Sequence, residues 1–293
     1  IRGAPRDALV ADIAPPHLRG ASFGLRQSLD TIGAFLGPLL AILTMWLTLD
    51  NFTTVFWIAV VPAFLSFALI VVAVREPARP AGLRKVKAPL SRPELKLLGG
   101  ACWWVIGIAA VFTLARFSEA FLILRALSVG LPAALAPAVM VVMNAIYALA
   151  AYPAGILSDR IDRLSVLVIG LVVLVAADLV LGLVDGIAGV AAGVALWGLH
   201  MGLTQGLLAA LLADSAPAEL RGTAFGVFNL ATGVALLAAS VIAGSLWDVA
   251  GPPGTFLAGG IFAAVALVAL LVLRGPLAES RRKLHGSAEA ANR

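Results

Sequence analysis

Asp12-Ile-Ala-Pro-Pro-His-Leu-Arg-Gly-Ala-Ser-Phe-Gly24 decides the fold, because its pattern recurs as Asp214-Ser-Ala-Pro-Ala-Glu-Leu-Arg-Gly-Thr-Ala-Phe-Gly226. The second copy lies 214 − 12 = 202 residues downstream, and eight of the thirteen positions are identical. Asp, Pro, Arg and Gly are among the matches, so chance similarity between two apolar loops explains them poorly. Each copy closes one apolar run and opens the next. The repeat therefore predicts two parallel copies of one helical unit.

The apolar runs around these stretches are long enough to cross a membrane. The 293 residues are 61% hydrophobic and 13% charged, with a mean hydropathy of +1.02, whereas soluble proteins carry about 25% charged residues. A hydrocarbon core of about 30 Å needs about 20 apolar residues in a helix. Eight runs reach that length: 20–47, 52–74, 97–119, 130–156, 164–184, 188–213, 222–247 and 252–274. The predicted fold class is all-α, a polytopic transmembrane helix bundle, with residues 1–12 interpreted as the end of a further helix.

Lys and Arg residues gather in every second connection, which predicts the orientation. The net charge is +5, and 16 of the 21 basic residues lie at 19, within 75–96, at 160 and 163, at 221 and from 274 onward. By the positive-inside rule, the 75–96 loop and the C-terminus are expected to be cytoplasmic. Because these charges mark topology, the basic composition does not indicate nucleic-acid binding.

Motifs for enzymatic chemistry are missing from the sequence. With Cys102 as the single cysteine, disulfides and cysteine-based metal sites within one chain are excluded. No nucleotide-binding glycine loop, metal-ligand cluster or Ser–His–Asp arrangement has a supporting context. We therefore expect no enzyme, no metal and no cofactor.

The repeat distance also predicts the domain organisation. Subtracting 202 from the start of the 97–119 helix gives 97 − 202 = −105, so about three helices are expected before Ile1. The predicted divisions are 1–74, the end of a first six-helix half (part of helix four, then helices five and six); 75–96, a cytoplasmic linker; 97–274, a second half; and 275–293, a cytoplasmic tail.

This organisation resembles the major facilitator superfamily, and two motifs strengthen the resemblance. The first, Gly155-Ile-Leu-Ser-Asp159-Arg160-Ile-Asp-Arg163, resembles the superfamily's cytoplasmic loop signature in its second-half copy, with Asp162 where glycine is usual. The second consists of Gly24, Gly33, Gly37 and Pro38, and it resembles the fifth-helix signature of drug–proton antiporters, with Ala41 and Ile42 in place of the final glycine pair. Gly33 and Gly37 share a helix face suited to close packing and Pro38 should bend the helix; a plain small-residue packing face is the alternative.

The resemblance implies a contact between the two halves. By pseudo-symmetry, Asp159 should approach the free N–H groups of residues 20–24, where the 20–47 helix begins. Arg163 should be held by Asp214 in the same half. The alternative is that these charges are solvated loop residues that fix topology.

Ionisable residues inside the predicted spans are few, and each is a functional candidate because its insertion costs at least about 2.5 kcal/mol. Arg6 and Asp7 precede the first hairpin centre by about ten residues and Arg26 follows it by about ten, so they should share one depth, and Asp30 lies one turn from Arg26. This cluster serves either a structural charge network, proton transfer and gating, or a charged substrate. Arg116 and Glu119, with Arg125 nearby, form a second group: a local ion pair, an outer gate or a proton-binding carboxylate.

Further polar side chains within the spans could line a cavity. Gly198, Gly202 and Gly206 predict a packing stripe on the 188–213 helix. His200 is the intramembrane residue whose ordinary pKa lies near physiological pH, although a neutral, hydrogen-bonded ring is the expected form. The full set of cavity candidates is Asn144, Tyr147, Asp178, His200, Thr204 and Gln205.

These observations predict a secondary active transporter that works by alternating access, with proton-coupled efflux of small molecules as the main hypothesis. The expected partners are a small-molecule substrate, protons and the lipid bilayer of a bacterial inner membrane, with no nucleic acid and a monomeric state. Asp30 and Glu119 are the expected proton-coupling carboxylates. An uptake symporter of the same fold and a non-transporting membrane sensor or scaffold are the alternatives.

Overall fold

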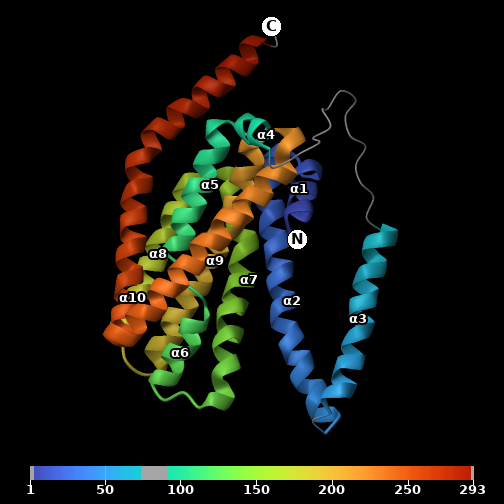
Figure 1. Ribbon diagram of the computed structural model, residues 1–293, viewed down its shortest axis with the longest axis vertical. Helices are drawn as coiled ribbons and strands as arrows, with labels where there is room; N and C mark the ends of the chain where they lie inside the picture. The colour runs from blue at the N-terminus through green and yellow to red at the C-terminus, as the bar shows by residue number, and fades with distance from the viewer. Residues whose placement is uncertain (1–2, 50, 74–90, 292–293) are drawn as a thin grey trace.

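The computed structural model describes residues 3–49, 51–73 and 91–291, and within them all side chains except those of 38, 41, 42, 70, 73, 92, 134 and 273–291. This part of the chain is helical and contains no strand (Figure 1). The helices are α1 (Gly3–Ile13), α2 (Arg19–Leu47), α3 (Phe52–Ala73), α4 (Arg92–Leu97), α5 (Gly99–Leu114), α6 (Ala120–Ser128), α7 (Ala136–Arg160), α8 (Arg163–Leu183), α9 (Ile187–Ser215) and α10 (Arg221–Ala291), with short 3-10 turns η1 (Pro16–Leu18), η2 (Ala133–Leu135) and η3 (Ala218–Leu220). Most of the predicted 75–96 linker and the side chains of the predicted 275–293 tail lie outside the described residues.

The sequence repeat is also a structural repeat. In each copy a proline in extended conformation, Pro15 (φ −56°, ψ 144°) or Pro217 (φ −54°, ψ 141°), ends the preceding helix. A three-residue 3-10 turn follows, and the next helix begins at Arg19 or Arg221. Proline has no N–H to continue a helical ladder, which explains why both copies break at this place. The two turns stand 202 residues apart, as the sequence predicts.

Most predicted spans match observed helices within a few residues. Within the described residues, five helical stretches are long and apolar enough to cross a membrane by length and composition. The last of them, Ala218–Val272, contains two of the predicted spans. These are separated at Gly251, whose positive φ of 69° interrupts α10 and turns the chain back on itself, from the orange to the red segment in Figure 1.

The predicted 97–119 helix is wrong in its extent. Helix α5 ends at Leu114, and α6 resumes at Ala120 after a non-helical segment, residues 115–119, called the α5–α6 linker below. The side chain of Ser118 accepts a hydrogen bond from the Ala120 N–H at 3.3 Å, and its carbonyl accepts one from Phe121. Serine competes with helical backbone bonding in this way. The predicted 130–156 helix correspondingly begins later, at Ala136.

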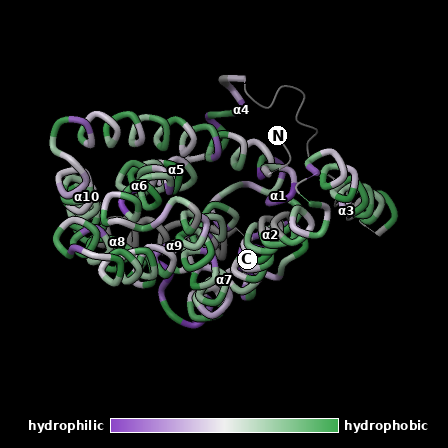
Figure 2. The backbone as a smooth tube through the Cα atoms, turned by 90° about the horizontal axis from the view of Figure 1, so that it is seen from below, coloured by the Kyte–Doolittle hydropathy of each residue, from purple (hydrophilic) through white to green (hydrophobic). Residues whose placement is uncertain are grey.

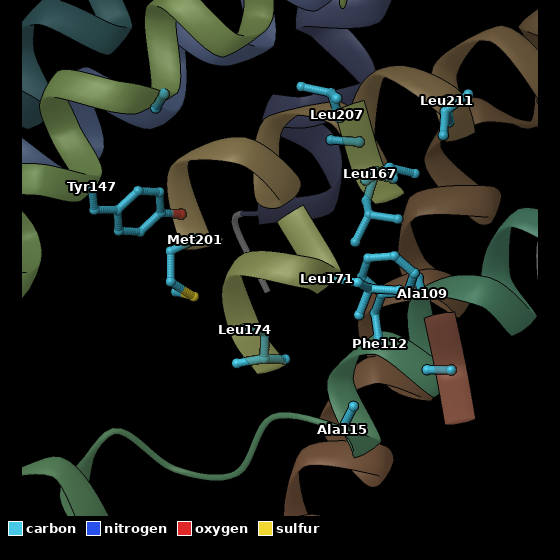
Figure 3. Packing of buried hydrophobic residues seen from close by; sticks show 14 of the residues in the cluster. Ala109, Phe112, Ala115, Tyr147, Leu167, Leu171, Leu174, Met201, Leu207 and Leu211 are labelled. Atoms are coloured by element: carbon cyan, nitrogen blue, oxygen red, sulfur yellow. The ribbon is translucent and has the colours of Figure 1, made fainter. Parts of the chain in front are cut away.

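The core lies between α5, α7, α8, α9 and α10. Its largest fully buried side chains include Trp197, Phe256 and a row of leucines in α8, and Figure 3 shows Leu167, Leu171 and Leu174 among their neighbours. Figure 2 shows hydrophobic residues along the outer helices as well, and many large apolar side chains, such as Trp57, Leu149 and Val249, are exposed. In the stretch of α3 that is long and apolar enough to cross a membrane, Phe52–Leu69, no residue is buried. Apolar surface on both sides of the helices is what a lipid environment allows.

Candidate functional site

The start of α2 is held by a carboxylate from the end of α7. Asp159 accepts hydrogen bonds from the N–H groups of Gly20 at 2.9 Å and Ala21 at 2.8 Å, one on each carboxylate oxygen. These N–H groups have no partner within their own helix, and the positive end of the helix dipole favours an anion there. The predicted contact between Asp159 and residues 20–24 is therefore confirmed.

Glycines allow the two helices to meet backbone to backbone beside this contact. A Cβ added to Gly155 would lie 2.4 Å from the Gly20 carbonyl oxygen and 3.1 Å from the Gly24 Cα. One added to Gly24 would lie 2.5 Å from the Ala151 carbonyl oxygen. Gly24 thus packs closely, as small residues in membrane helices do.

The other members of the antiporter-like motif do not pack in this way. A Cβ on Gly33 or Gly37 would meet no described atom within 4 Å, so the predicted close packing at these two glycines is not seen. Pro38 lies within α2, but its side chain is outside the described set. Figure 1 shows α2 and α7 side by side at one end and apart at the other. Contact between them extends as far as Ser28, whose hydroxyl donates to the Ala148 carbonyl at 2.6 Å.

Asp214 connects the two halves near the Asp159 contact. Arg163 donates to Asp214, which confirms the predicted pair, and also to Asp159 at 3.0 Å. Arg19, from the first half, reaches the other oxygen of Asp214 at 2.8 Å. Arg160, another charged member of the loop motif, is exposed and forms no hydrogen bond or ion pair with the described residues.

A second pair makes the arrangement reciprocal. Arg221 donates to Asp12, so the arginine of each repeat copy bonds the aspartate of the other. Phe23 and Phe225, equivalent positions of the repeat, also meet with ring centroids 6.0 Å apart. Sequence analysis missed this exchange, although its signal was the presence of Asp and Arg among the eight identical positions. The six charged residues Asp12, Arg19, Asp159, Arg163, Asp214 and Arg221, with the N–H groups of Gly20 and Ala21, are called the latch below.

The charge cluster of the first hairpin forms as predicted. Arg6 lies 3.3 Å from Asp7 and 3.2 Å from Asp30, and Arg26 lies 3.3 Å from Asp7 and 3.9 Å from Asp30. The four side chains differ in exposure: Asp7 and Arg26 retain 12% and 16%, whereas Asp30 retains 46%. Asp30 is therefore the carboxylate of this cluster that water or a ligand reaches most easily.

The second predicted charge group divides into two. Arg116 and Glu119 both lie in the α5–α6 linker, and no ion pair within 4 Å joins them among the described contacts. Arg125 instead points away, donating to the Leu181 carbonyl at 2.8 Å and pairing with Asp185 at 3.0 Å. Its expected place beside Glu119 is wrong, because α6 turns it toward the end of α8.

Tyr147 stands between the two charge groups. Its side chain is buried in α7 beside Met201 (Figure 3), and a guanidinium nitrogen of Arg116 contacts the Met201 sulfur. Four charged residues act electrostatically on the Tyr147 hydroxyl group. Arg116 and Glu119 belong to its own half, and Arg26 and Asp30 belong to the other half. Tyr147 thus brings both predicted charge groups to one interface, called the midplane site below.

Two other cavity candidates turn away from this interface. His200 is buried, with Nδ1 2.8 Å from the Gly170 carbonyl of α8, and Thr204 is buried with its hydroxyl on the His200 carbonyl at 2.8 Å. Both fill the contact between α8 and α9, so their expected cavity position is wrong. Asn144 and Gln205 are half-buried. Asp178 is fully buried on α8 against α10.

The predicted stripe of Gly198, Gly202 and Gly206 packs closely. A Cβ on Gly198 would lie 2.4 Å from the Met143 carbonyl oxygen, and one on Gly202 would lie 2.6 Å from the Ala150 Cβ, both in α7. A Cβ on Gly206 would lie 3.3 Å from the Gly24 Cα of α2. The stripe therefore joins α9 to both α7 and α2.

Comparison with known proteins gives consistent results. The sequence model of the Major Facilitator Superfamily matches residues 120–292. An uncharacterised MFS-type transporter of Methanocaldococcus jannaschii is 34% identical over 286 residues, 93% of this chain and 68% of that protein. An uncharacterised protein of Mycobacterium bovis is 25% identical over 253 residues, 85% of this chain and 61% of that protein. The chain thus spans about two thirds of the length of these relatives.

A solved structure shares the fold. The crystal structure of the human organic anion transporter MFSD10 (TETRAN) superposes with a TM-score of 0.73 at 18% sequence identity, covering 91% of this chain and 67% of that one.

Proposed function

We propose a specific transport mechanism for this chain, which belongs to the major facilitator superfamily. Membership and fold make it a multi-pass membrane transporter of small molecules rather than an enzyme. The mechanism that we propose is proton-coupled efflux by alternating access, in which the two halves rock about the midplane site. The protein acts as a monomer in the cell membrane.

The latch is the observation that carries this proposal. It closes one end of the interface between the halves through Asp159 on the start of α2 and through two reciprocal Arg–Asp pairs. Among the charged contacts of the latch, these cross between the halves, whereas the Arg163–Asp214 pair lies within the second half. Opening this end needs these polar contacts, the glycine packing of α2 on α7 and the Phe23–Phe225 contact to separate, while the second half stays intact. The distribution of Lys and Arg supports a cytoplasmic position for the latch end, together with the C-terminus, by the positive-inside rule.

Protonation of the first-hairpin cluster supplies the coupling in this mechanism. Asp30 pairs with Arg6 and Arg26 and is half exposed. A proton on Asp30 removes one of the two negative charges that hold these arginines, leaving Asp7 to hold both. The freed charge of Arg26 then acts on Tyr147 across the interface. Glu119, beside Arg116, is the second carboxylate that we assign to this step.

Efflux from cells tests the proposal with the protein expressed from its complete gene. A panel of cationic, anionic and neutral fluorescent dyes should include some that expressing cells retain less than control cells do, and a protonophore should abolish the difference. Asp30→Asn should lose this proton-driven efflux, whereas Glu219→Gln, an exposed acid in η3, should keep it. The double variant Arg26→Gln with Asp30→Asn separates the roles, because normal transport by it would make the pair purely structural.

Other outcomes point to the alternative functions. Proton-driven accumulation of a dye inside the cells would replace efflux by uptake symport. Binding of dyes without movement in either direction would contradict transport and favour a membrane sensor.

A further inference from the structure

Asp178 is a buried acid without a hydrogen-bond partner among the residues that the structure describes. It lies in α8, fifteen residues after Arg163, or about 22 Å along the helix, and its side chain is 0% exposed. Neither carboxyl oxygen has a hydrogen-bond partner among the described residues. In a protein interior most buried polar side-chain atoms are hydrogen-bonded. Two carboxyl oxygens without hydrogen bonds on one buried acid therefore need an explanation.

The surroundings of Asp178 are apolar on each packed side. A Cβ on Gly259 of α10 would lie 3.2 Å from Asp178 Oδ2 and 2.8 Å from the Phe117 ring, and one on Gly260 would lie 3.4 Å from the Asp178 Cβ. The two adjacent glycines thus let the α10 backbone cover the carboxyl group. From the α5–α6 linker, only the ring of Phe117 is described close to this place.

Among the described residues, no cation pairs with this acid. The titratable groups on the packed elements are the latch residues Arg163, Asp214 and Arg221; His200 of α9, held at Gly170 two turns away; Arg116, Glu119 and Arg125 in and after the α5–α6 linker; and the exposed Asp248 of α10. None of them forms an ion pair with Asp178 among the described residues. Its carboxyl group is fully buried and forms no hydrogen bond with any described residue. An isolated buried carboxylate is too costly to persist and takes up a proton instead.

A purely structural role does not account for this side chain. A neutral acid without hydrogen bonds adds nothing that an apolar side chain of similar size would not add, and apolar replacement of buried polar groups is often neutral or stabilising. An ionisable group within a membrane span is by default a functional candidate. Asp178 is therefore a candidate for a function beyond packing.

The α5–α6 linker connects Asp178 to the midplane site. Arg116 faces Met201 and Tyr147, whereas the next residue, Phe117, lies over Gly259 on the Asp178 side. The Phe117 ring also packs against Trp197 and Phe256, with centroids 5.3 Å away in each case. Adjacent residues of a non-helical segment thus touch both places. A substrate that displaces Arg116 would move Phe117 with it.

We propose that Asp178 is a proton-binding site of the second half, loaded when its carboxyl is buried and emptied when Phe117 and α10 move away. In this step the O–H bond of the carboxylic acid breaks, the electron pair stays on the carboxylate, and the proton passes to water. Reloading reverses these changes. The inference rests on the proposed transport function and adds a second proton site to Asp30.

Two measurements on the complete protein in lipid vesicles test this site without a known substrate. The first is infrared difference spectroscopy after a pH jump, with labelled aspartate. A protonated aspartic acid signal should be present while the latch is closed and absent in Asp178→Asn. The second is the spin-label distance between cysteines at Leu18 and Ile161, which are 45% and 44% exposed on either side of the latch, in a Cys102→Ala background. This distance should change with pH in the parent protein, and Asp178→Asn should lose that response.

Matched variants make the result decisive. Asp248→Asn, an exposed acid on α10, should keep both signals. Asp178→Leu should fold at least as stably as the parent and also lose the pH response, which separates proton binding from packing. An unchanged acid signal in Asp178→Asn, or a parental pH response in Asp178→Leu, would overturn the proposal. If proton-driven efflux survives in Asp178→Asn, this inference fails and the proposed function stands. If the parent protein shows the Asp178 signal but no proton-driven transport, the proposed function fails and Asp178 remains a proton-binding site.

Discussion

Asp214→Asn should shift the equilibrium of the latch toward the open state by about 100-fold. Asp214 holds Arg19 from one half and Arg163 from the other, with 25% of its own side chain exposed. Removing one partner of a buried ion pair costs about 3–5 kcal/mol, and partial exposure places this case at the low end. About 3 kcal/mol corresponds to about two factors of ten in an equilibrium constant. The spin-label distance between Leu18 and Ile161 should lengthen accordingly.

The control for this change lies in the same connection. Glu219→Gln removes an exposed acid five residues later, in η3, and should leave the distance unchanged. An identical distance distribution in Asp214→Asn and the parent would show that the ion pairs do not hold the latch closed.

Gly155→Ala should also open the latch, by steric exclusion rather than by loss of charge. Its new methyl group would lie 2.4 Å from the Gly20 carbonyl oxygen and 3.1 Å from the Gly24 Cα, and backbone atoms cannot rotate aside. Overpacking of this kind costs about 1–3 kcal/mol. The expected result is a longer distance between Leu18 and Ile161, together with lower thermal stability of the closed state.

Gly107→Ala adds the same methyl group to a helix at a position where no described atom lies within 4 Å. Since alanine has the higher helix propensity, by about 1 kcal/mol, this control should be neutral or stabilising. Equal behaviour of the two variants would contradict the close contact between α2 and α7.

The latch was predictable where it depends on local chemistry. Asp159 belongs to the loop motif at the end of α7, and α2 begins with free N–H groups. Both partners of this contact can therefore be inferred from the sequence. The exchange between Arg19 and Asp214 and between Arg221 and Asp12 depends on how the two repeat copies dock. How the copies dock depends on the tertiary structure. The identical Asp and Arg positions of the two copies were the sign of this docking in the sequence.

The errors have physical reasons of their own. Arg116, Ser118 and Glu119 were interpreted as polar residues within the span that begins at 97, so the end of α5 at Leu114 and the capping of α6 by Ser118 were not recognised. In α9 most faces are apolar and buried. The sequence pattern therefore did not indicate which neighbouring helix His200 and Thr204 face. Asp178 could be recognised as unusual from sequence, but its lack of partners follows only from the packing of α8 against α10.

Reversible cross-linking across the latch tests the central claim, alternating access, most directly. Cysteines at Leu18 and Ile161 in a Cys102→Ala background can be joined by a short bifunctional thiol reagent that reduction removes. With a dye that the parent protein expels, the account predicts that cross-linking stops transport because the latch end cannot open, and that reduction restores it. Transport at the original rate while the two halves remain cross-linked would contradict the account.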